Sequence, residues 1–226
     1  MTRSEINGYI REAKEFFGAM NFSLPPWAFW HPDEWKRQAA KCGRILRQKL
    51  GWDVTDFGGG PYPERGLLLF ALRNGDAGDP IRPYAEKIMI VRENQETPFH
   101  FHWNKTEDII NRGGGRLILE LFNTTDDDGF ADTPVTVSVD AIDRTVEAGG
   151  AIVLEPGESI TLVPRLYHRF YGEQGGGLVL TGEVSKVNDD DTDNRFYTPL
   201  GRYPQIVEDE EPVHLLVPDY DRYVGA

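Results

Sequence analysis

Apolar positions in residues 1–52 recur three and four apart, which is the spacing of an amphipathic helix. The first predicted helix opens with a capping box of Thr2 and Glu5, and its apolar face comprises Ile6, Tyr9, Ile10, Ala13, Phe16, Phe17 and Met20. A second helix is predicted between Pro32 and Gly51, with an apolar face of Trp35, Ala39, Cys42, Leu46 and Leu50. Because Cys42 lies on this face, we interpret it as a small buried residue rather than a nucleophile.

From about residue 53 the pattern changes to short runs of β-forming residues, separated by turn sequences such as Asn74-Gly75 and Pro156-Gly157. The runs that we predict as strands are residues 67–72, 87–92, 98–102, 116–122, 135–139, 151–154, 159–163, 167–171 and 178–182. Many short strands joined by Gly and Pro turns are typical of an antiparallel sandwich or barrel. We therefore predict a mainly β fold with N-terminal α-helices packed outside it.

The chain length fits a single domain over residues 1–226, built in three parts. A helical layer is expected in residues 1–52 and a barrel in about residues 60–187. The tail, residues 188–226, is polar but contains several aromatic residues. We therefore expect this tail to wrap around the barrel.

Composition argues against several classes of protein. Hydrophobic residues make up 39% and aromatic residues 12% of the chain, as in packed globular proteins. A formal net charge of −13 argues against a nucleic-acid partner, and the acidic runs 189–191 and 208–211 are interpreted as solvated loops. No apolar stretch approaches about 18 residues and no secretory leader is visible. We expect no membrane partner and a cytoplasmic location, which the lone Cys42 also suits.

Four residues of metal-ligand type form a pattern along the predicted strands. Residues two apart on a strand point to the same face, so His100 and His102 are expected to aim together. Glu107 follows after enough residues for the chain to turn, and His168 stands on a later strand. A lone His is more often a satisfied polar residue than a ligand. The whole pattern, however, predicts that His100, His102, Glu107 and His168 bind one divalent metal ion.

This pattern resembles the cupin family of antiparallel, jelly-roll-like β-barrels, whose first motif is Gly-x5-His-x-His-x3–4-Glu-x6-Gly. The His-x-His-x4-Glu part matches, Asn94 replaces the leading Gly, and residues 113–115 supply the trailing Gly. The second cupin motif ends in Pro-x-Gly-x-x-His. Here Pro164-Arg-Leu-Tyr-His168 lacks the Gly and is one residue shorter. The resemblance covers about residues 60–187 and implies a cupin-type barrel.

Three further segments resemble the D-lyxose isomerase family of cupins, over about residues 84–202. They are Tyr84-Ala-Glu-Lys-Ile-Met-Ile90, Glu107-Asp-Ile-Ile-Asn-Arg-Gly-Gly114 and the run from Gly182 to Phe196. The resemblance implies a D-lyxose ketol-isomerase that interconverts D-lyxose with D-xylulose and D-mannose with D-fructose. It also implies Mn²⁺ as the cofactor and a homodimer. The N and O ligands alone suit Co²⁺, Fe²⁺, Ni²⁺ or Zn²⁺ as well.

Aldose–ketose isomerisation moves a proton between C1 and C2 of the sugar through a cis-enediolate. Four protein ligands on an ion that prefers about six leave two adjacent positions for O1 and O2. A general base must then face C1 and C2, ideally with a pKa drawn towards neutrality by burial. Glu183 follows the apolar run 178–181 and is our candidate base, with a strand-end salt bridge as its alternative role. Lys87 opens another apolar strand and is the second catalytic candidate, as a donor or a proton shuttle.

Four more residues are candidates for sugar binding. Lys105 lies between two of the predicted metal ligands, and it can donate to a sugar oxygen or stand as a solvated loop residue. Asp193 and Arg195 can fix the distal hydroxyls of a sugar, or can form an ion pair that anchors a loop. Trp103 can stack on the face of the sugar or pack in the barrel.

Two other functions are compatible with the pattern, because the cupin fold hosts several chemistries. An Fe-dependent cupin dioxygenase shares a shell of three His and one Glu, but activates O2 in a mainly apolar pocket. A sugar-sensing or storage cupin keeps the barrel without turnover. No cluster of Arg and Lys marks a phosphate site, and strand alternation directs Arg169 away from His168. We therefore expect a free sugar rather than a sugar phosphate.

Overall fold

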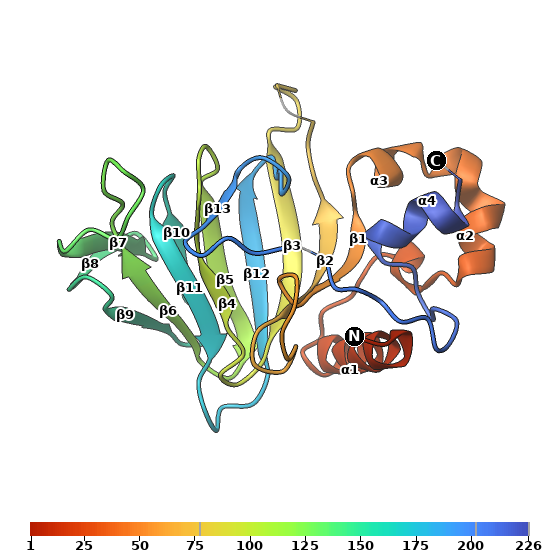
Figure 1. Ribbon diagram of the computed structural model, residues 1–226, viewed down its shortest axis with the longest axis horizontal. Helices are drawn as coiled ribbons and strands as arrows, with labels where there is room; N and C mark the ends of the chain where they lie inside the picture. The colour runs from red at the N-terminus through yellow and green to blue at the C-terminus, as the bar shows by residue number, and fades with distance from the viewer. Residues whose placement is uncertain (77, 202, 226) are drawn as a thin grey trace.

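The molecule has a helical end and a β-sheet body (Figure 1). The computed structural model describes residues 1–76, 78–201 and 203–225. Its helices are α1 (Arg3–Ala19), α2 (Pro32–Gln38), α3 (Gly43–Arg47) and α4 (Tyr220–Tyr223), and its 3-10 turns are η1 (Pro26–Phe29), η2 (Ala39–Lys41) and η3 (Val217–Asp219). The capping box predicted for the first helix is confirmed. The Thr2 hydroxyl accepts the Glu5 N–H, and the Glu5 carboxylate accepts the Thr2 N–H at 2.7 Å.

The prediction of one continuous second helix is wrong. The segment breaks into α2, η2 and α3, with Cys42 between the last two at φ −93° and ψ 0°. Gly43 has a low helix propensity and does not carry the helix through this point. Trp35 and Cys42 are nevertheless buried, as expected, because the broken helix still packs its apolar stripe against Leu215 and Tyr220.

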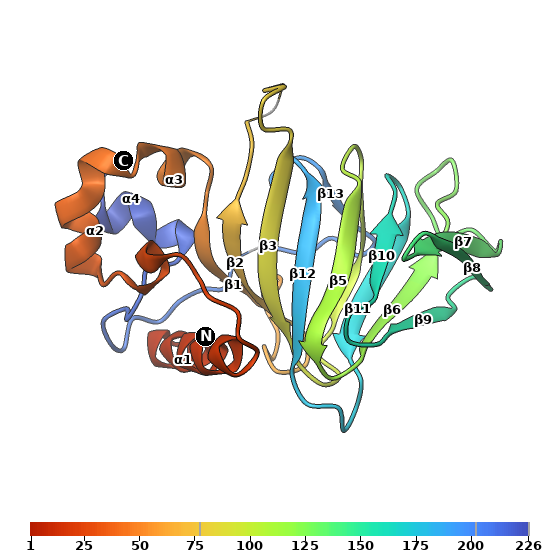
Figure 2. The ribbon, with the colours of Figure 1, turned by 180° about the vertical axis from the view of Figure 1, so that it is seen from behind.

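The strands form two antiparallel sheets that face each other (Figure 2). The larger sheet has the order β1 (Gly51–Thr55), β2 (Leu67–Arg73), β3 (Tyr84–Val91), β12 (Val179–Lys186), β5 (Glu107–Gly114), β10 (Ser159–Leu162), β7 (Val135–Val139) and β8 (Ile142–Val146). The smaller sheet has the order β13 (Asn194–Phe196), β4 (Thr97–His102), β11 (Tyr167–Gly172), β6 (Leu117–Phe122) and β9 (Ala151–Leu154). The predicted cupin-type β fold with helices outside is confirmed.

The apolar core lies between the two sheets. Alternate residues of β6, Leu117, Leu119 and Leu121, are buried and pack against apolar side chains of the larger sheet such as Val137 and Ile160. This inward alternation is what a sheet with one covered face requires. Towards β3, β12 and β4, several inner positions are polar, and these polar positions form the candidate site described below.

The helices cover the outer face of the larger sheet. Ile6, Ile10 and Phe17 of α1 form one apolar cluster with Phe70 and Ile88 on the outer face of β2 and β3. Figures 1 and 2 both show α1 and the remaining helices gathered beside β1 and β2. Within the described residues, no helix combines the length and the apolarity needed to cross a membrane.

Arg3 joins the first helix to the C-terminal tail. Its buried guanidinium donates two hydrogen bonds to Asp219, at 2.9 and 2.8 Å, and two to Glu208, both at 2.8 Å. The sequence predicts a solvated acidic run at residues 208–211, and the ion pair of Glu208 with Arg3 corrects that interpretation for Glu208. The tail is also joined to the N-terminus by a bridge between Thr2 and Val207.

We expect Arg3→Met to lower the free energy of unfolding by about 3 to 5 kcal/mol, because it leaves the buried Asp219 carboxylate without its partner charge. Arg222 offers a matched control, since it also contacts Glu208, at 3.2 Å, but its side chain is 61% exposed. Arg222→Met should cost about 1 kcal/mol or less. Urea unfolding measures both values, and equal effects of the two substitutions would contradict the expectation.

Candidate active site

Residues of both sheets meet at the candidate site. His100 and His102 lie on β4 of the smaller sheet, whereas Glu107 is the first residue of β5 in the larger sheet. Residues 103–106 make the connection between the two sheets. His168 lies on β11 as the cross-strand partner of His100, and their ring centroids are 4.2 Å apart. Three imidazoles of one sheet therefore face a carboxylate of the other.

Three residues at or near the glycine positions of the cupin motifs have a left-handed backbone conformation, although two of them are not glycine. Asn94 takes the place of the first motif's leading Gly at φ 55°, and Arg165 precedes His168 at φ 62°. Asn tolerates this conformation well, and Arg165 is held by a 2.8 Å hydrogen bond from its N–H to the His102 carbonyl. The trailing Gly114 also has a positive φ, of 89°. The two missing glycines thus leave the metal-ligand candidates in place.

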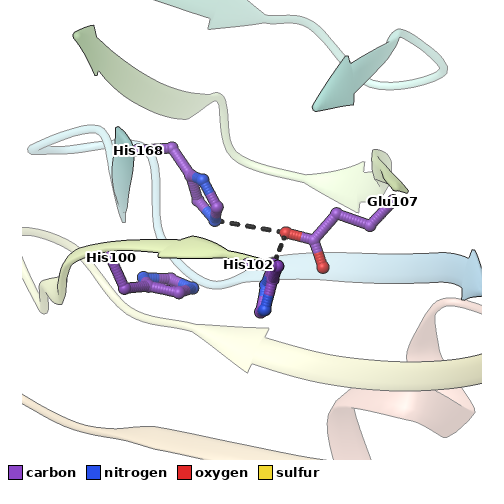
Figure 3. A group of neighbouring side chains, drawn as sticks. All are labelled: His100, His102, Glu107 and His168. Atoms are coloured by element: carbon purple, nitrogen blue, oxygen red, sulfur yellow. Dashed lines mark ion pairs between the residues drawn. The ribbon is translucent and has the colours of Figure 1, made fainter. Parts of the chain in front are cut away.

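The four predicted ligands form one buried cluster (Figure 3). His102 Nε2 and His168 Nε2 approach the same oxygen of Glu107, Oε1, at 3.2 and 3.1 Å. One ligand atom from each of the four residues can be chosen so that all lie within 4.8 Å of one another. The structure therefore brings together the whole set that the sequence pattern predicts.

The hydrogen bond of the His168 imidazole fits a metal ion. His168 Nδ1 lies 3.0 Å from the Leu166 carbonyl, which only accepts, so in the neutral ring Nε2 carries no hydrogen. This buried Nε2 has no hydrogen-bond partner among the described residues, yet it faces the Glu107 carboxylate. Two acceptors repel each other unless a cation lies between them. Adjacent ligands of an octahedral ion with bonds of about 2.1 Å lie about 3 Å apart, so the cluster fits a divalent ion.

The protonation states of the cluster also suit a metal ion. Burial holds the pKa of His100 well below its ordinary value, with a further contribution from His168. Burial likewise lowers the pKa of His102. Burial alone would raise the pKa of Glu107, but the Lys105 ammonium, His102 and His168 together outweigh it and hold that pKa well below the usual range. Neutral imidazoles and an ionised carboxylate are the forms that bind a divalent ion.

A buried chain of charges connects the cluster to Glu183. Lys105 Nζ lies 2.7 Å from Glu107 Oε2 and donates to Glu183 Oε1 at 2.9 Å. Lys87, the register partner of Glu183 on β3, donates to Glu183 Oε2 at 3.3 Å. Lys105 is buried, so it is not the solvated loop residue that its alternative interpretation held. Both lysines and Glu183 line one cavity with His100, His102 and Glu107.

The pKa of Glu183 differs from the expectation for a base. Burial would raise the pKa of this carboxyl, but the ammonium groups of Lys105 and Lys87 outweigh it and lower the pKa below its ordinary value. Burial of a carboxyl after an apolar strand predicts a raised pKa, whereas the two cations come beside Glu183 only through long-range contacts. Glu183 is therefore ionised at neutral pH and is held between two hydrogen-bond donors.

Two site residues were missed in the sequence. Asn188 Oδ1 accepts a hydrogen bond from Lys87 at 2.6 Å, and Asp190 Oδ1 lies 3.6 Å from the same ammonium. Asp190 lines the cavity, so the interpretation of residues 189–191 as a solvated loop is wrong for it. The signal was the position of these residues just after the strand that carries Glu183. Two lysines beside one carboxylate also call for further acceptors.

Asp193 has a structural partner instead of a place on the cavity wall. Its carboxylate accepts the backbone N–H groups of Asn104 and Lys105, at 2.8 and 3.0 Å, and its carbonyl accepts the Trp103 N–H at 3.0 Å. These bonds anchor the turn between β4 and β5, which carries Lys105. The structure gives Asp193 an anchoring role, which is close to its alternative interpretation, and does not place it among the residues that line the cavity.

Arg195 and Trp103 are likewise absent from the residues that line the cavity. Arg195 Nε lies 3.6 Å from Asp128 Oδ2. Trp103 packs edge-on against Phe101 and lies under the Arg165 guanidinium, on the outer side of β4. Alternation along β4 explains this position, since a strand that directs His102 inward directs its neighbour outward. The structure does not bring these two residues to the site.

The cavity has a volume of about 420 Å³, which suits a small molecule. Its polar residues include three members of the cluster (His100, His102 and Glu107) and also Lys87, Lys105, Glu183 and Asp190. Much of the remaining wall is apolar, with Leu67, Met89, Phe170 and Phe196 among its residues. Such a cavity can hold a polar ligand by one end and cover its carbon chain with apolar side chains.

Comparisons with known proteins identify the family of this chain. The sequence model of the D-lyxose isomerase family matches residues 1–220. A D-lyxose/D-mannose isomerase of Serratia proteamaculans is 49% identical, over 100% of both chains. A second protein of that name, from Escherichia coli O157:H7, is also 49% identical, over 99% of this chain and 100% of its own.

Solved structures show the same fold at low sequence identity. The ligand-free L-ribose isomerase of Cellulomonas parahominis has a TM-score of 0.62 and 16% identity, over 92% of this chain and 98% of its own. The L-ribose isomerase of Geodermatophilus obscurus has a TM-score of 0.53 and 18% identity, over 88% and 93%. The fold is thus shared with other sugar isomerases, and the family match spans nearly the whole chain. This protein belongs to the D-lyxose isomerase family of sugar isomerases.

Proposed function

We propose that this protein is a metal-dependent aldose–ketose isomerase that interconverts D-lyxose with D-xylulose and D-mannose with D-fructose through a cis-enediolate. Family membership and the names of the two curated relatives support the choice of sugars. The observation that carries the mechanism is the Lys105 bridge. Lys105 contacts both Glu107 and Glu183, so it holds Glu183, a carboxylate outside the metal-ligand set, close to the metal-ligand candidate Glu107.

His100, His102, Glu107 and His168 would hold the ion, which we propose to be Mn²⁺. The bound ion would polarise the carbonyl of the sugar and stabilise the negative charge that develops on O1 and O2. The same N and O donors also accept Co²⁺, Fe²⁺, Ni²⁺ or Zn²⁺.

The residues of the chain would move the protons. Glu183 takes the proton from C2 of the aldose and delivers it to C1, which forms the ketose. The hydroxyl proton passes from O2 to O1 in the same interconversion. Lys87 and Lys105, which both donate to Glu183, would donate hydrogen bonds to these oxygens. A sugar oxygen that draws Lys87 away from Glu183 also raises the pKa of the carboxyl, towards the value that a base needs.

The cavity favours a free sugar over a sugar phosphate. Its lysines are Lys87 and Lys105, and both already contact carboxylates. Arg169, the neighbour of His168, pairs instead with Glu120 and Glu96 on the outer side of β11. A phosphate would therefore have to displace an ion pair, at a cost in binding free energy.

An isomerase assay tests the proposal. Metal-stripped protein is reloaded with Mn²⁺ and given D-lyxose, D-mannose or D-mannose 6-phosphate, while ketose formation and dissolved oxygen are followed together. We expect ketose from the two free sugars, none without metal, and no uptake of oxygen. Oxygen uptake would instead support a cupin dioxygenase. Binding of the sugar without any turnover would support a sugar-sensing protein, and either result would overturn the isomerase proposal.

A further inference from the structure

A β-bulge in β4 changes which residues of this strand face the cavity. On β11, His168 and Phe170 are two residues apart and so point to the same face. Their partners on β4 are His100 and Thr97, which are three residues apart, because the register shifts between the two pairs. The extra residue of the bulge reverses the alternation. Thr97 therefore faces inward together with His100, and both line the cavity.

The bulge has a second effect, on the orientation of His100. The Pro98 carbonyl, inside the bulge, lies 2.8 Å from His100 Nδ1 and so holds the ring with Nε2 free. Phe99 is directed to the outer side, where it packs against Phe122 and Phe130. This one bulge thus determines both the orientation of the His100 ring and the inward direction of Thr97.

The hydroxyl of Thr97 lacks a partner. The residue is only 4% exposed, and its Oγ1 is buried without a hydrogen bond to any described residue. Its cross-strand partner, Phe170, is apolar, as are Leu67 and Met89 on the opposite wall of the cavity. A buried hydroxyl that is left unpaired costs about 1 to 3 kcal/mol, whereas Val would fill the same space at no such cost. This position calls for a polar group supplied by a ligand.

We propose that Thr97 is a specificity-determining residue that forms a hydrogen bond with one hydroxyl of the distal part of the sugar, on C4 or beyond. This inference rests on the proposed isomerase function. With C1 and C2 of the sugar between the cluster and Glu183, the carbon chain runs along β4 past His100, towards the side away from His102. Thr97 is the next inward residue in that direction, and it provides a hydroxyl on an otherwise apolar stretch of wall.

The test compares Thr97→Val, which removes the hydroxyl and keeps the shape, with Thr97→Ser, which keeps the hydroxyl. On D-lyxose we expect Thr97→Val to raise KM about tenfold with kcat within about twofold, and Thr97→Ser to restore most of the loss. A thermal melt confirms that both variants fold. The unsubstituted enzyme provides an independent test with 4-deoxy- and 5-deoxy-D-lyxose. One of these two sugars lacks the hydroxyl that contacts Thr97, and on that sugar the KM of the unsubstituted enzyme should also rise about tenfold.

On that same deoxy sugar, Thr97→Val should behave like the unsubstituted enzyme, because the contact is already missing. Two results would overturn the role of Thr97 while leaving the isomerase function intact. One is an unchanged KM of Thr97→Val on D-lyxose, and the other is an equal rise in the KM of Thr97→Val on D-lyxose and on both deoxy sugars. If the unsubstituted, Mn²⁺-loaded enzyme forms no ketose from any of these sugars, the proposed function itself fails and this inference fails with it.

Discussion

Replacing Glu183 by Gln is expected to lower kcat on D-lyxose about a thousandfold, within the range that a general base contributes. The amide keeps the size of the side chain but cannot take a proton from C2. Lys105 keeps its contact with Glu107, and Lys87 keeps its contacts with Asn188 and Asp190, so neither buried ammonium is left without an acceptor. We therefore expect the variant to fold and to bind Mn²⁺, which steady-state kinetics, a thermal melt and elemental analysis of the purified protein measure together.

A matched control lies on the opposite face of the same sheet. Glu86 is adjacent in register, opposite Val184, but its carboxylate pairs with the exposed Arg73. Glu86→Gln removes the same charge from the same sheet and should leave kcat within about twofold. If Glu183→Gln retained a tenth or more of the activity, the base would have to be another group, and Lys87 would become the first candidate.

The metal-ligand cluster could be predicted from the sequence because local rules decide most of it. His100 and His102 share a face through strand alternation alone, and His168 needs only a neighbouring antiparallel strand. Glu107 is harder to place, since β5 belongs to the other sheet and its apolar and polar residues do not alternate in the sequence, although its burial does. The buried positions of β5 include the polar residues Glu107 and Asn111, so the sequence does not mark these positions as facing inward.

The positions of the residues around the cluster depend on long-range pairing and on a β-bulge, which a single sequence does not show. The sequence suggests a sugar-binding role for Asp193, but its role as an acceptor of backbone N–H groups becomes visible only when the tail is paired beside β4. The acidic run 189–191 predicts a solvated loop, because the contact of Asp190 with Lys87 is long-range and is not visible in the sequence. Thr97 is the strongest example. Regular alternation from His100 directs it outward, and only the bulge brings it into the cavity.

Loss of one ligand should abolish activity through loss of the ion. In His168→Leu we expect bound Mn²⁺ to fall from about one ion per chain to near zero, and kcat/KM to fall by about a thousandfold or more, since a Lewis acid contributes several kcal/mol to the transition state. The leucine fills most of the volume of the imidazole and lies beside Phe170 and Leu166, so the barrel should fold. Elemental analysis after dialysis against Mn²⁺ measures the first effect, and the ketose assay measures the second.

His214 serves as the control, because it is a buried histidine outside the cluster, held by Lys14 and by the Trp30 carbonyl. His214→Leu should keep its Mn²⁺ and its activity. The melting temperature separates the two sites further. Mn²⁺ binds only the folded protein in this scheme, so adding it should raise the melting temperature of the unsubstituted chain and of His214→Leu, but not that of His168→Leu. An Mn²⁺-dependent rise in all three would place the ion elsewhere, because a chain without His168 would then still bind it.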